Sequence, residues 1–270
     1  MDPVSEFESL VARNIDGLKR DRALQEQSND WILKTLPHGY SYNFRWMGRP
    51  IIQYPQDMVA LQELIWQIKP DLIIEAGIAH GGSLILSASM LALLDYCDAV
   101  NNGQPLNPRA TRRRVLGIDI DIRAHNRAAI ETHPMAHRID MIEGSSIDPQ
   151  VVAQVRAAAQ RHEHVLVILD SNHTHEHVLA ELEAYAPLTT AGSYCVVFDT
   201  VVEDIPEAIF PGRPWGKGNN PKTAVWEYLR RLRDEGRTGA DGVPLAFEID
   251  KAIESKLLIT VAPDGYLHRI

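Results

Sequence analysis

Cysteine is nearly absent from this sequence, because only Cys97 and Cys195 occur among its 270 residues. Two cysteines at this separation form neither a disulfide framework nor a cysteine-based zinc site. We therefore expect a protein of a reducing compartment, and we expect that compartment to be the cytoplasm.

Basic residues are also fewer than acidic ones: the chain has 27 Lys and Arg and 36 Asp and Glu, which gives a net charge of -9 at pH 7. A general nucleic-acid binder needs a basic face that releases counterions from phosphates. The balance therefore argues against nucleic acid as a partner and favours small molecules. The one basic stretch, NNGQPLNPRATRRR at 101–114, is interpreted as a solvated surface loop. Binding of an anionic substrate or of a neighbouring subunit is its alternative interpretation.

Long apolar runs are missing as well. No run approaches the roughly 18 residues of a membrane span, and the N-terminal MDPVSEFESLVARNIDGLK is charged where a signal peptide is apolar. With 45% apolar and 23% charged residues, the chain is long enough to bury a substantial core. We expect one soluble domain without a membrane span.

From residue 71 onward, short runs rich in Ile, Val and Leu alternate with segments of helical period, which indicates parallel strands joined by helices. The expected strands are 72–77, 114–121, 138–144, 164–170 and 194–200. The expected helices lie near 82–96, 123–133, 149–162, 175–186 and 220–236. Two further β-rich segments, 246–253 and 256–270, leave no room for a crossover helix, so one of them must run antiparallel.

These elements predict an α/β fold over residues 71–270, with a doubly wound, mostly parallel sheet of seven strands whose last strand is antiparallel. Residues 1–70 form an N-terminal arm ahead of it. The part of the arm at 29–58 is aromatic and loop-like rather than periodic, and it is a candidate cap over a site.

Small and acidic residues follow the expected strands, and ligands of an open parallel sheet bind beyond the carboxyl ends of its strands. The turn after the first strand lets a ligand approach backbone N–H groups at a helix start. A carboxylate after the second suits a ribose diol, and hydroxyls after the third suit an adenine edge. The candidate cofactor-binding residues are Glu75, Gly77, Gly81, Ser83, Asp119, Ser145 and Ser146.

The glycine turn also bears on which adenosine cofactor is bound. A dinucleotide fingerprint needs G-x-G-x-x-G, but Gly77-x-Ala79-x-x-Gly82 lacks the middle glycine. S-adenosylmethionine (SAM) carries no phosphate, and an acid just before the turn, here Glu75, suits its ammonium and sulfonium charges. The stretch EAGIAHG fits the corresponding E/D-x-G-x-x-x-G pattern. The pattern favours SAM, although a purely structural turn also explains such glycines.

Five blocks of the sequence resemble the cephalosporin hydroxylase family, from about residue 20 to the C-terminus. They are EAGIAHGGSLILSASML, VLGIDIDIR, LDSNHTHEHVL, YCVVFDTVVEDIP and RPWGKGNNPKTAVWEYL. Despite the family's name, the resemblance implies a methyltransferase fold, SAM as the methyl donor and a sugar hydroxyl as the acceptor, in a small molecule or glycoconjugate. It also implies a homo-oligomer.

The resemblance further implies a Mg²⁺ site at the ends of the fourth and fifth strands, held by Asp170 and Asp199. Mg²⁺ prefers oxygen ligands, so two carboxylates and two substrate hydroxyls make a reasonable set. The catalytic base that the resemblance implies is His173, three residues after the first aspartate.

One departure from the family pattern affects the metal. Relatives often carry a glutamate where this chain has Phe198, so one carboxylate is missing. We expect Thr200 to supply an oxygen in its place, with Glu203 or Asp204 as the alternatives.

The other histidines have competing interpretations. His175 and His177 are expected in the first turn of a helix with Thr174 as its N-cap, in structural roles. A zinc hydrolase site of the H-x-H-x-D-H type is disfavoured, because the spacing differs and its aspartate is absent. His80 is expected either to touch cofactor or substrate, or to pack its own loop.

The segment 211–220 is interpreted either as a loop that closes over substrate or as a rigid surface connection. Its candidate residues are Trp215, Lys217 and Asn219.

Two other functions compete with methyl transfer. One is an oxidoreductase, either nicotinamide-dependent through Gly77 or an iron hydroxylase, which needs two histidines and a carboxylate. The other is a non-catalytic cofactor-binding paralogue, for which Phe198 is the only hint.

Overall fold

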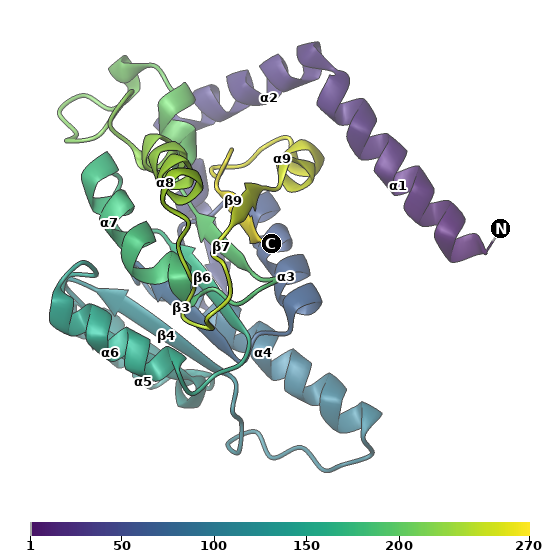
Figure 1. Cartoon of the computed structure of the whole chain (residues 1–270), viewed down its shortest axis with the longest axis vertical. Helices are drawn as coiled ribbons and strands as arrows, with labels where there is room; N and C mark the ends of the chain where they lie inside the picture. The colour runs from purple at the N-terminus through teal and green to yellow at the C-terminus, as the bar shows by residue number, and fades with distance from the viewer. Residues whose placement is uncertain (1) are drawn as a thin grey trace.

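The computed structural model describes residues 2–270. Over that range seven strands form one sheet in the order β5-β4-β3-β6-β7-β9-β8 (Figure 1). Their bounds are β3 (Leu72–Ala76), β4 (Arg114–Asp119), β5 (Ile139–Glu143), β6 (Val165–Leu169), β7 (Tyr194–Val197), β8 (Phe247–Ile249) and β9 (Tyr266–Arg269). Strands β3 to β7 are parallel, whereas β9 runs antiparallel to both of its neighbours. This confirms the predicted doubly wound sheet and its antiparallel last strand.

Helices cover both faces of the sheet (Figure 1), because alternate strand residues face opposite sides. One apolar core joins Leu72 and Ile74 to α6, α7 and α8, and the other joins Ile73 to α3 and α4. The helices are α3 (Pro55–Ile68), α4 (Gly82–Asn101), α5 (Ala124–Glu131), α6 (Pro149–Ala159), α7 (His175–Tyr185), α8 (Pro221–Glu235) and α9 (Lys251–Leu257). The five predicted crossover helices are therefore confirmed, and their ends differ by a few residues.

The expectation of β structure throughout 246–270 was wrong in part, because α9 (Lys251–Leu257) lies within it. The Asp250 side chain accepts hydrogen bonds from the backbone N–H groups of Ala252 and Ile253, which caps this helix. A local cap thus prevails over the β-branched residues nearby.

The arm is more regular than its aromatic sequence indicated. It contains α1 (Pro3–Arg20), α2 (Arg22–Thr35) and a hairpin of β1 (Phe44–Trp46) and β2 (Arg49–Ile51), followed by α3 (Pro55–Ile68). Short 3₁₀ helices lie at Leu36–His38, Tyr40–Asn43, Ala136–Arg138, Ala186–Leu188, Thr200–Asp204 and Glu207–Ile209. The loop-like prediction for 29–58 was wrong where α2, the hairpin and the start of α3 lie. In addition, α3 covers the sheet although it precedes residue 71.

The β1–β2 hairpin is clamped onto the glycine turn that follows β3. Arg49 donates from Nε and Nη2 to the His80 carbonyl, at 3.0 and 2.5 Å. Trp46 Nε1 donates to Ser89 Oγ on α4 at 2.9 Å. A Cβ on Gly82 would overlap the Pro50 carbonyl oxygen, so this contact requires glycine. The arm therefore forms one wall of whatever lies beside the turn.

Helix α4 changes the expectation that no apolar segment approaches the length of a membrane span. Among the described residues it is the one helix long and apolar enough, by length and composition, to cross a membrane. Its buried residues lie mainly in its first half and include Leu84, Ile85 and Leu91. Packing against the sheet and α3 accounts for this hydropathy, because the core helix of a folded domain passes the same test.

Replacing Gly82 by Ala tests the contact between hairpin and turn. The new Cβ would push Pro50 and Ile51 away, so we expect Gly82→Ala to lower the free energy of unfolding by about 1–3 kcal/mol. Gly17→Ala is the control, since Gly17 lies within α1 with nothing near its Cβ position. It should be neutral or stabilise by up to about 1 kcal/mol. Urea unfolding of both variants measures the difference, and equal stability would contradict the contact.

Candidate functional site

A cavity of about 380 Å³ opens at the carboxyl ends of β3, β6 and β7. This is the point where the strand order reverses, and it is the expected ligand position in an open parallel sheet. Three parts of the chain line it besides the strand ends: the glycine turn, the arm around Tyr40 to Tyr54, and the segment from Ile205 to Trp215.

Three of the predicted residues meet in this cavity. Asp170, His173 and Asp199 each place one possible ligand atom within 4.8 Å of the others. His173 Nε2 lies 3.2 Å from Asp199 Oδ2. Asp199 adopts a left-handed backbone (φ 55°) directly after β7, a conformation that aspartate tolerates better than most residues. The turn after the strand thus aims its carboxylate at the histidine.

The electrostatics of this group favour a cation. Burial, and then the negative charges of Asp199 and Glu75, raise the pKa of Asp170 well above its usual range. Among the described residues that line the cavity, Arg213 is the one Lys or Arg. The two carboxylates thus share a lining that holds a single basic side chain, and a hard divalent cation with oxygen preference fits them.

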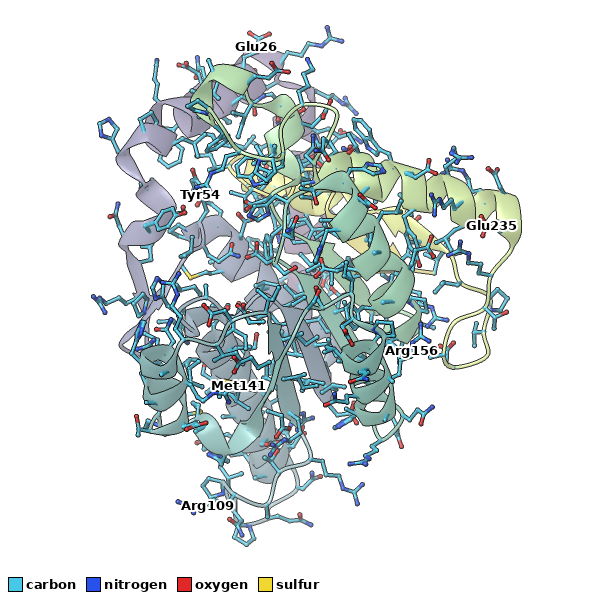
Figure 2. The ribbon with its side chains drawn as sticks, turned by 90° about the vertical axis from the view of Figure 1, so that its left-hand side faces the viewer. Glu26, Tyr54, Arg109, Met141, Arg156 and Glu235 are labelled. Carbon is cyan, nitrogen blue, oxygen red and sulfur yellow. The ribbon has the colours of Figure 1, made fainter. Side chains whose placement is uncertain are left out.

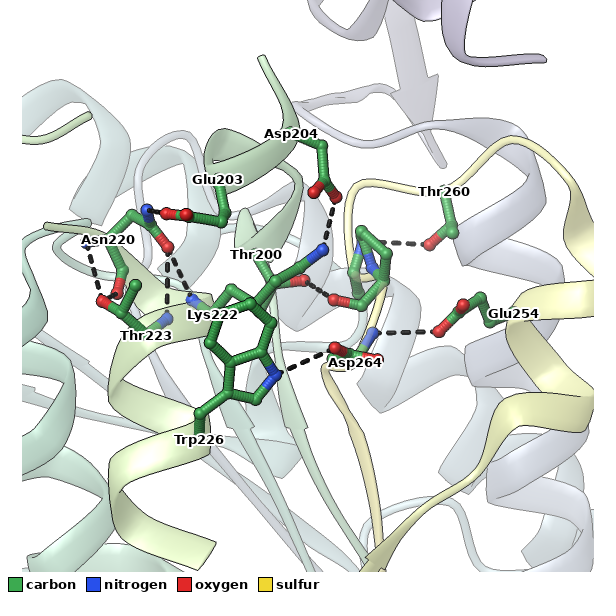
Figure 3. Close-up of polar contacts among 12 residues, drawn as sticks. Thr200, Glu203, Asp204, Asn220, Lys222, Thr223, Trp226, Glu254, Thr260 and Asp264 are labelled. Carbon is green, nitrogen blue, oxygen red and sulfur yellow. Dashed lines mark hydrogen bonds and ion pairs between the residues drawn. The ribbon is translucent and has the colours of Figure 1, made fainter. Parts of the chain in front are cut away.

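Thr200 does not complete the group as predicted. Its side chain is fully buried, and its Oγ1 donates to the Pro263 carbonyl at 2.6 Å (Figure 3). A buried hydroxyl takes the nearest available acceptor. Phe198, at the position of the missing acid, points into the core with 2% exposure. The aspartates and His173 are thus the groups gathered here.

Glu203 and Asp204, the alternatives to Thr200, are directed at α8 (Figure 3). Glu203 Oε2 accepts from the Gly218 N–H at 2.8 Å and from Asn220 Nδ2 at 2.5 Å. Asp204 forms an ion pair with Lys222. Both acids therefore anchor the 211–220 loop and its helix, which is a role that the sequence did not indicate.

The 211–220 loop covers the cavity through Trp215. The Trp215 ring lies edge-on to His173, with centroids 5.3 Å apart, and packs on Phe210 at 4.9 Å. Arg213 lies over the same indole at 5.7 Å. Sequence reasoning found Trp215 but missed Phe210 and Arg213.

The other two candidate residues in this loop, Lys217 and Asn219, have other roles. Lys217 is exposed and lies outside the cavity lining. Asn219 Oδ1 accepts from the His175 N–H at 2.9 Å, so it caps α7. The predicted N-cap, Thr174, stands at that position, but its hydroxyl donates to Asn172 Oδ1 at 2.8 Å and makes no capping bond.

The glycine turn lies as predicted along the cavity, which Gly77, Ser83 and His80 help to line. A Cβ on Gly77 would overlap the Asp170 carbonyl oxygen, so glycine lets the two strand ends touch. Gly81 (φ 81°) begins α4. The sequence placed this turn correctly.

Asp119 is tied to the same turn. Its Oδ2 accepts from the N–H groups of Ile78 and Ala79, at 2.9 and 3.1 Å. These bonds hold the turn's backbone in place. Ribose binding by Asp119 stays a prediction.

Glu75 is a buried carboxyl beneath the turn, with 2% exposure. Burial raises its pKa to about 7, although the nearby hydroxyls of Ser83 and Ser87 partly offset this. Over residues 2–270, its Oε2 has no hydrogen-bond partner. The predicted contact with a cationic cofactor would supply one, but it remains untested.

Ser146 belongs to a buried network rather than to an open edge. Its Oγ donates to Glu181 Oε1 at 2.5 Å and lies 3.0 Å from His177 Nε2. Glu181 also accepts from Ser171 at 2.5 Å. The hydroxyl is thus already engaged, which leaves half-buried Ser145 as the freer of the two adenine candidates.

His175 and His177 lie in the first turn of α7, as expected. His175 Nδ1 contacts Thr223 Oγ1 at 2.8 Å, and His177 joins the Ser146 network. Both residues therefore support the surrounding helices.

The arm supplies the site residue that the sequence gave no reason to select. Gln53 Nε2 donates to Asp170 Oδ2 at 3.2 Å, across 117 positions of sequence. Nothing in the segment marks this glutamine, since its partner lies far away in the chain.

Comparisons with known proteins identify the family of this chain. A model of the family Rhamnosyl O-methyltransferase/CmcI matches residues 38–270. The rhamnosyl O-methyltransferase of Mycobacterium leprae is 31% identical over 227 residues, covering 83% of this chain and 82% of that protein. The protein of the same name from Mycobacterium tuberculosis is 30% identical over 228 residues, covering 83% and 77%.

Among solved structures, CmcI with Mg and SAM has a TM-score of 0.53 and 17% identity, over 85% of this chain and 77% of that chain. Strand order and cavity position define a class I methyltransferase fold. The chain belongs to the rhamnosyl O-methyltransferase/CmcI family, and it is a methyltransferase by family and by fold.

The raised pKa of Glu75 predicts a pH dependence of stability. A carboxyl that binds its proton more tightly when folded contributes stability that is complete below its unfolded pKa, near 4.5, and is lost as the pH rises to about 7. We expect the unfolding free energy of the wild type to fall, relative to Glu75→Gln, by on the order of 3 kcal/mol between pH 4 and 8. Urea unfolding across this range measures it. Parallel curves would show that Glu75 is not perturbed.

Proposed function

We propose that the protein transfers a methyl group from SAM to a hydroxyl of a sugar or sugar-containing small molecule, assisted by Mg²⁺ at Asp170 and Asp199. The observation that carries the proposal is the convergence of these aspartates and His173 in one cavity beside the glycine turn. Membership of a family whose relatives are named rhamnosyl O-methyltransferases supports it.

When bound, SAM supplies an electrophilic methyl group, and Mg²⁺ lowers the pKa of the reacting hydroxyl and fixes its position. Residues of the chain itself bind the cation and accept the proton. Asp170 and Asp199 hold the cation, and His173 accepts the proton of the hydroxyl. Asp199 lies within hydrogen-bonding distance of His173 Nε2 and steadies the charged imidazolium that results.

The walls of the cavity assist the proposed reaction by covering the site and by holding the acceptor in place. Trp215 and the arm cover His173 and Asp170, which limits access of water and holds the acceptor near the base. Glu75 provides negative charge beneath the turn, where the cationic methyl donor is proposed to bind. The glycine turn and Asp119 would hold its remaining parts.

The composition of the polar group favours this function over iron-dependent hydroxylation. An iron hydroxylase uses two histidines and one carboxylate, whereas here two carboxylates meet one histidine. Mg²⁺ prefers oxygen, so His173 stays free to act as a base.

The cavity lining bears on the acceptor. Tyr40, Tyr42, Phe210 and Trp215 offer apolar ring faces, which suit the C–H face of a sugar. The basic linker lies elsewhere: Figures 1 and 2 place it, with Arg109, at the end of the molecule opposite the arm. With exposed Lys217 also outside the lining, a neutral glycosyl group fits better than a polyphosphate carrier.

Assembly and location remain proposals. Helix α1 exposes an apolar stripe of Val4, Phe7, Leu10 and Val11, which supports a homo-oligomer. Cys97 and Cys195 are both free, in keeping with the proposed reducing cytoplasm.

Substitutions at the base and the metal ligand test the function. We expect His173→Ala and Asp170→Asn to lower methyl transfer by about 10²–10⁴-fold, because each removes a group that acts on the reacting hydroxyl. His175→Ala is the control, since His175 contacts Thr223 outside the cavity lining. Formation of S-adenosylhomocysteine with a rhamnoside acceptor gives the rates. Near-wild-type rates in both variants would refute the assignment.

Ligand-induced stabilisation separates methyl transfer from nicotinamide chemistry. At 100 times its Kd, S-adenosylhomocysteine should stabilise the wild type by about 2.7 kcal/mol, while NADH should have no effect. Thermal unfolding with each ligand measures this. A shift with NADH alone would favour the oxidoreductase. A shift with S-adenosylhomocysteine but no turnover at any Mg²⁺ concentration would favour the non-catalytic paralogue.

A further inference from the structure

Gln53 is a buried amide in the wall that the arm contributes to the cavity. It lies between the β1–β2 hairpin and α3, and only 4% of it is exposed. The hairpin on its N-terminal side is fixed by Arg49, which bonds the His80 carbonyl. The backbone that carries Gln53 is therefore held against the glycine turn.

The hydrogen bond to Asp170 defines which way this amide faces. In the ionised form that binds a cation, Asp170 only accepts hydrogen bonds, so the amide NH₂ of Gln53 is the group 3.2 Å from Asp170 Oδ2. The amide oxygen, Oε1, then faces away from the carboxylate. Within residues 2–270, this oxygen is buried and has no hydrogen-bond partner.

A buried amide oxygen without a partner is unfavourable, and native proteins rarely retain one without a reason. Gln53 lines the cavity together with Asp170 and His173. Because Oε1 itself has almost no exposed surface, a donor in the cavity reaches it only when the amide shifts toward the cavity on binding. A sugar offers such donors as hydroxyls next to the one that reacts.

We propose that Gln53 is a positioning and specificity residue for the acceptor. Its Nε2 holds one oxygen of Asp170 and leaves the other for the cation. Its Oε1 accepts a hydrogen bond from a second hydroxyl of the sugar. With these two contacts, the arm determines which of two neighbouring hydroxyls reaches His173. This inference rests on the proposed function, because it assumes a polyhydroxyl acceptor.

Gln53→Met tests the role, because methionine matches glutamine in length but neither donates to a carboxylate nor accepts strongly. Gln56→Met is the matched control: Gln56 also has a buried, unpartnered Oε1, but it lies on α3 outside the cavity lining. Each variant is compared with the wild type in methyl transfer to a rhamnoside, in the NMR-determined position of the new methyl ether, and in Mn²⁺ affinity measured by electron paramagnetic resonance without acceptor.

For Gln53→Met we expect acceptor kcat/KM to fall about 10–100-fold, the value for leaving one buried hydroxyl of the acceptor without its hydrogen-bond partner. The product should change from one methyl ether to a mixture of two, and Mn²⁺ should bind several-fold more weakly. Gln56→Met should match the wild type within about twofold.

A single methyl ether made at the wild-type rate, with unchanged Mn²⁺ affinity, would overturn the proposal. Thermal unfolding of the ligand-free variants guards against a purely structural role. Gln53→Met loses the hydrogen bond to Asp170 but also removes the unpartnered Oε1, and these two effects oppose each other. Its stability should therefore lie close to that of Gln56→Met, and marked destabilisation would also count against the proposal. If the wild type makes no methyl ether, the proposed function fails, and the Mn²⁺ affinities still show whether Gln53 positions Asp170.

Discussion

The repulsion between carboxylates at the ends of β6 and β7 is the constraint around which the site is built. Asp170 and Asp199 approach each other and share a single histidine, and the pKa of Asp170 is raised by burial and by their mutual charge. A parallel sheet forces this meeting, because adjacent strands end at the same edge. Neutralisation by a divalent cation would relieve the repulsion, so we expect the proposed metal binding and the site geometry to depend on each other.

Three segments outside the strands keep this charged group in place. The glycine turn touches the Asp170 backbone, the arm bonds its carboxylate through Gln53, and the 211–220 loop sets Trp215 against His173. Glu203 ties that loop to the 3₁₀ helix that follows Asp199. The cavity is thus closed by parts that are distant in sequence but anchored to the same strand ends.

Much of the fold followed from local pattern. Continuous Ile, Val and Leu runs marked the buried parallel strands, and acids at or after the ends of those runs marked the site edge. The structure brings Asp170 and Asp199 together at that edge, whereas Glu75 lies within β3 and is buried beneath the glycine turn. Helix α9 was not predicted, because a single capping aspartate outweighs the β-branched residues around it. The regular structure of the arm was not predicted, because its order comes from docking onto the glycine turn. No local periodicity of the sequence indicates that contact.

The roles of other residues depended on partners far away in the chain. Thr200 bonds Pro263, and Gln53 meets Asp170 across 117 positions. From its residue type, Thr200 was predicted to be a metal ligand, whereas the residue type of Gln53 gave no reason to assign it a role. Which polar groups remain free to bind a ligand is decided by tertiary packing, and for that reason these assignments had to come from the structure.

The central claim is that a cation joins Asp170 and Asp199 while His173 stays outside its coordination shell as the base. A crystal structure with Mn²⁺ and S-adenosylhomocysteine tests it directly through the anomalous signal of manganese. The account predicts one anomalous peak at about 2.0–2.3 Å from an oxygen of each aspartate, with the His173 nitrogens beyond bonding distance. No peak, or a peak bonded to a His173 nitrogen, would contradict it.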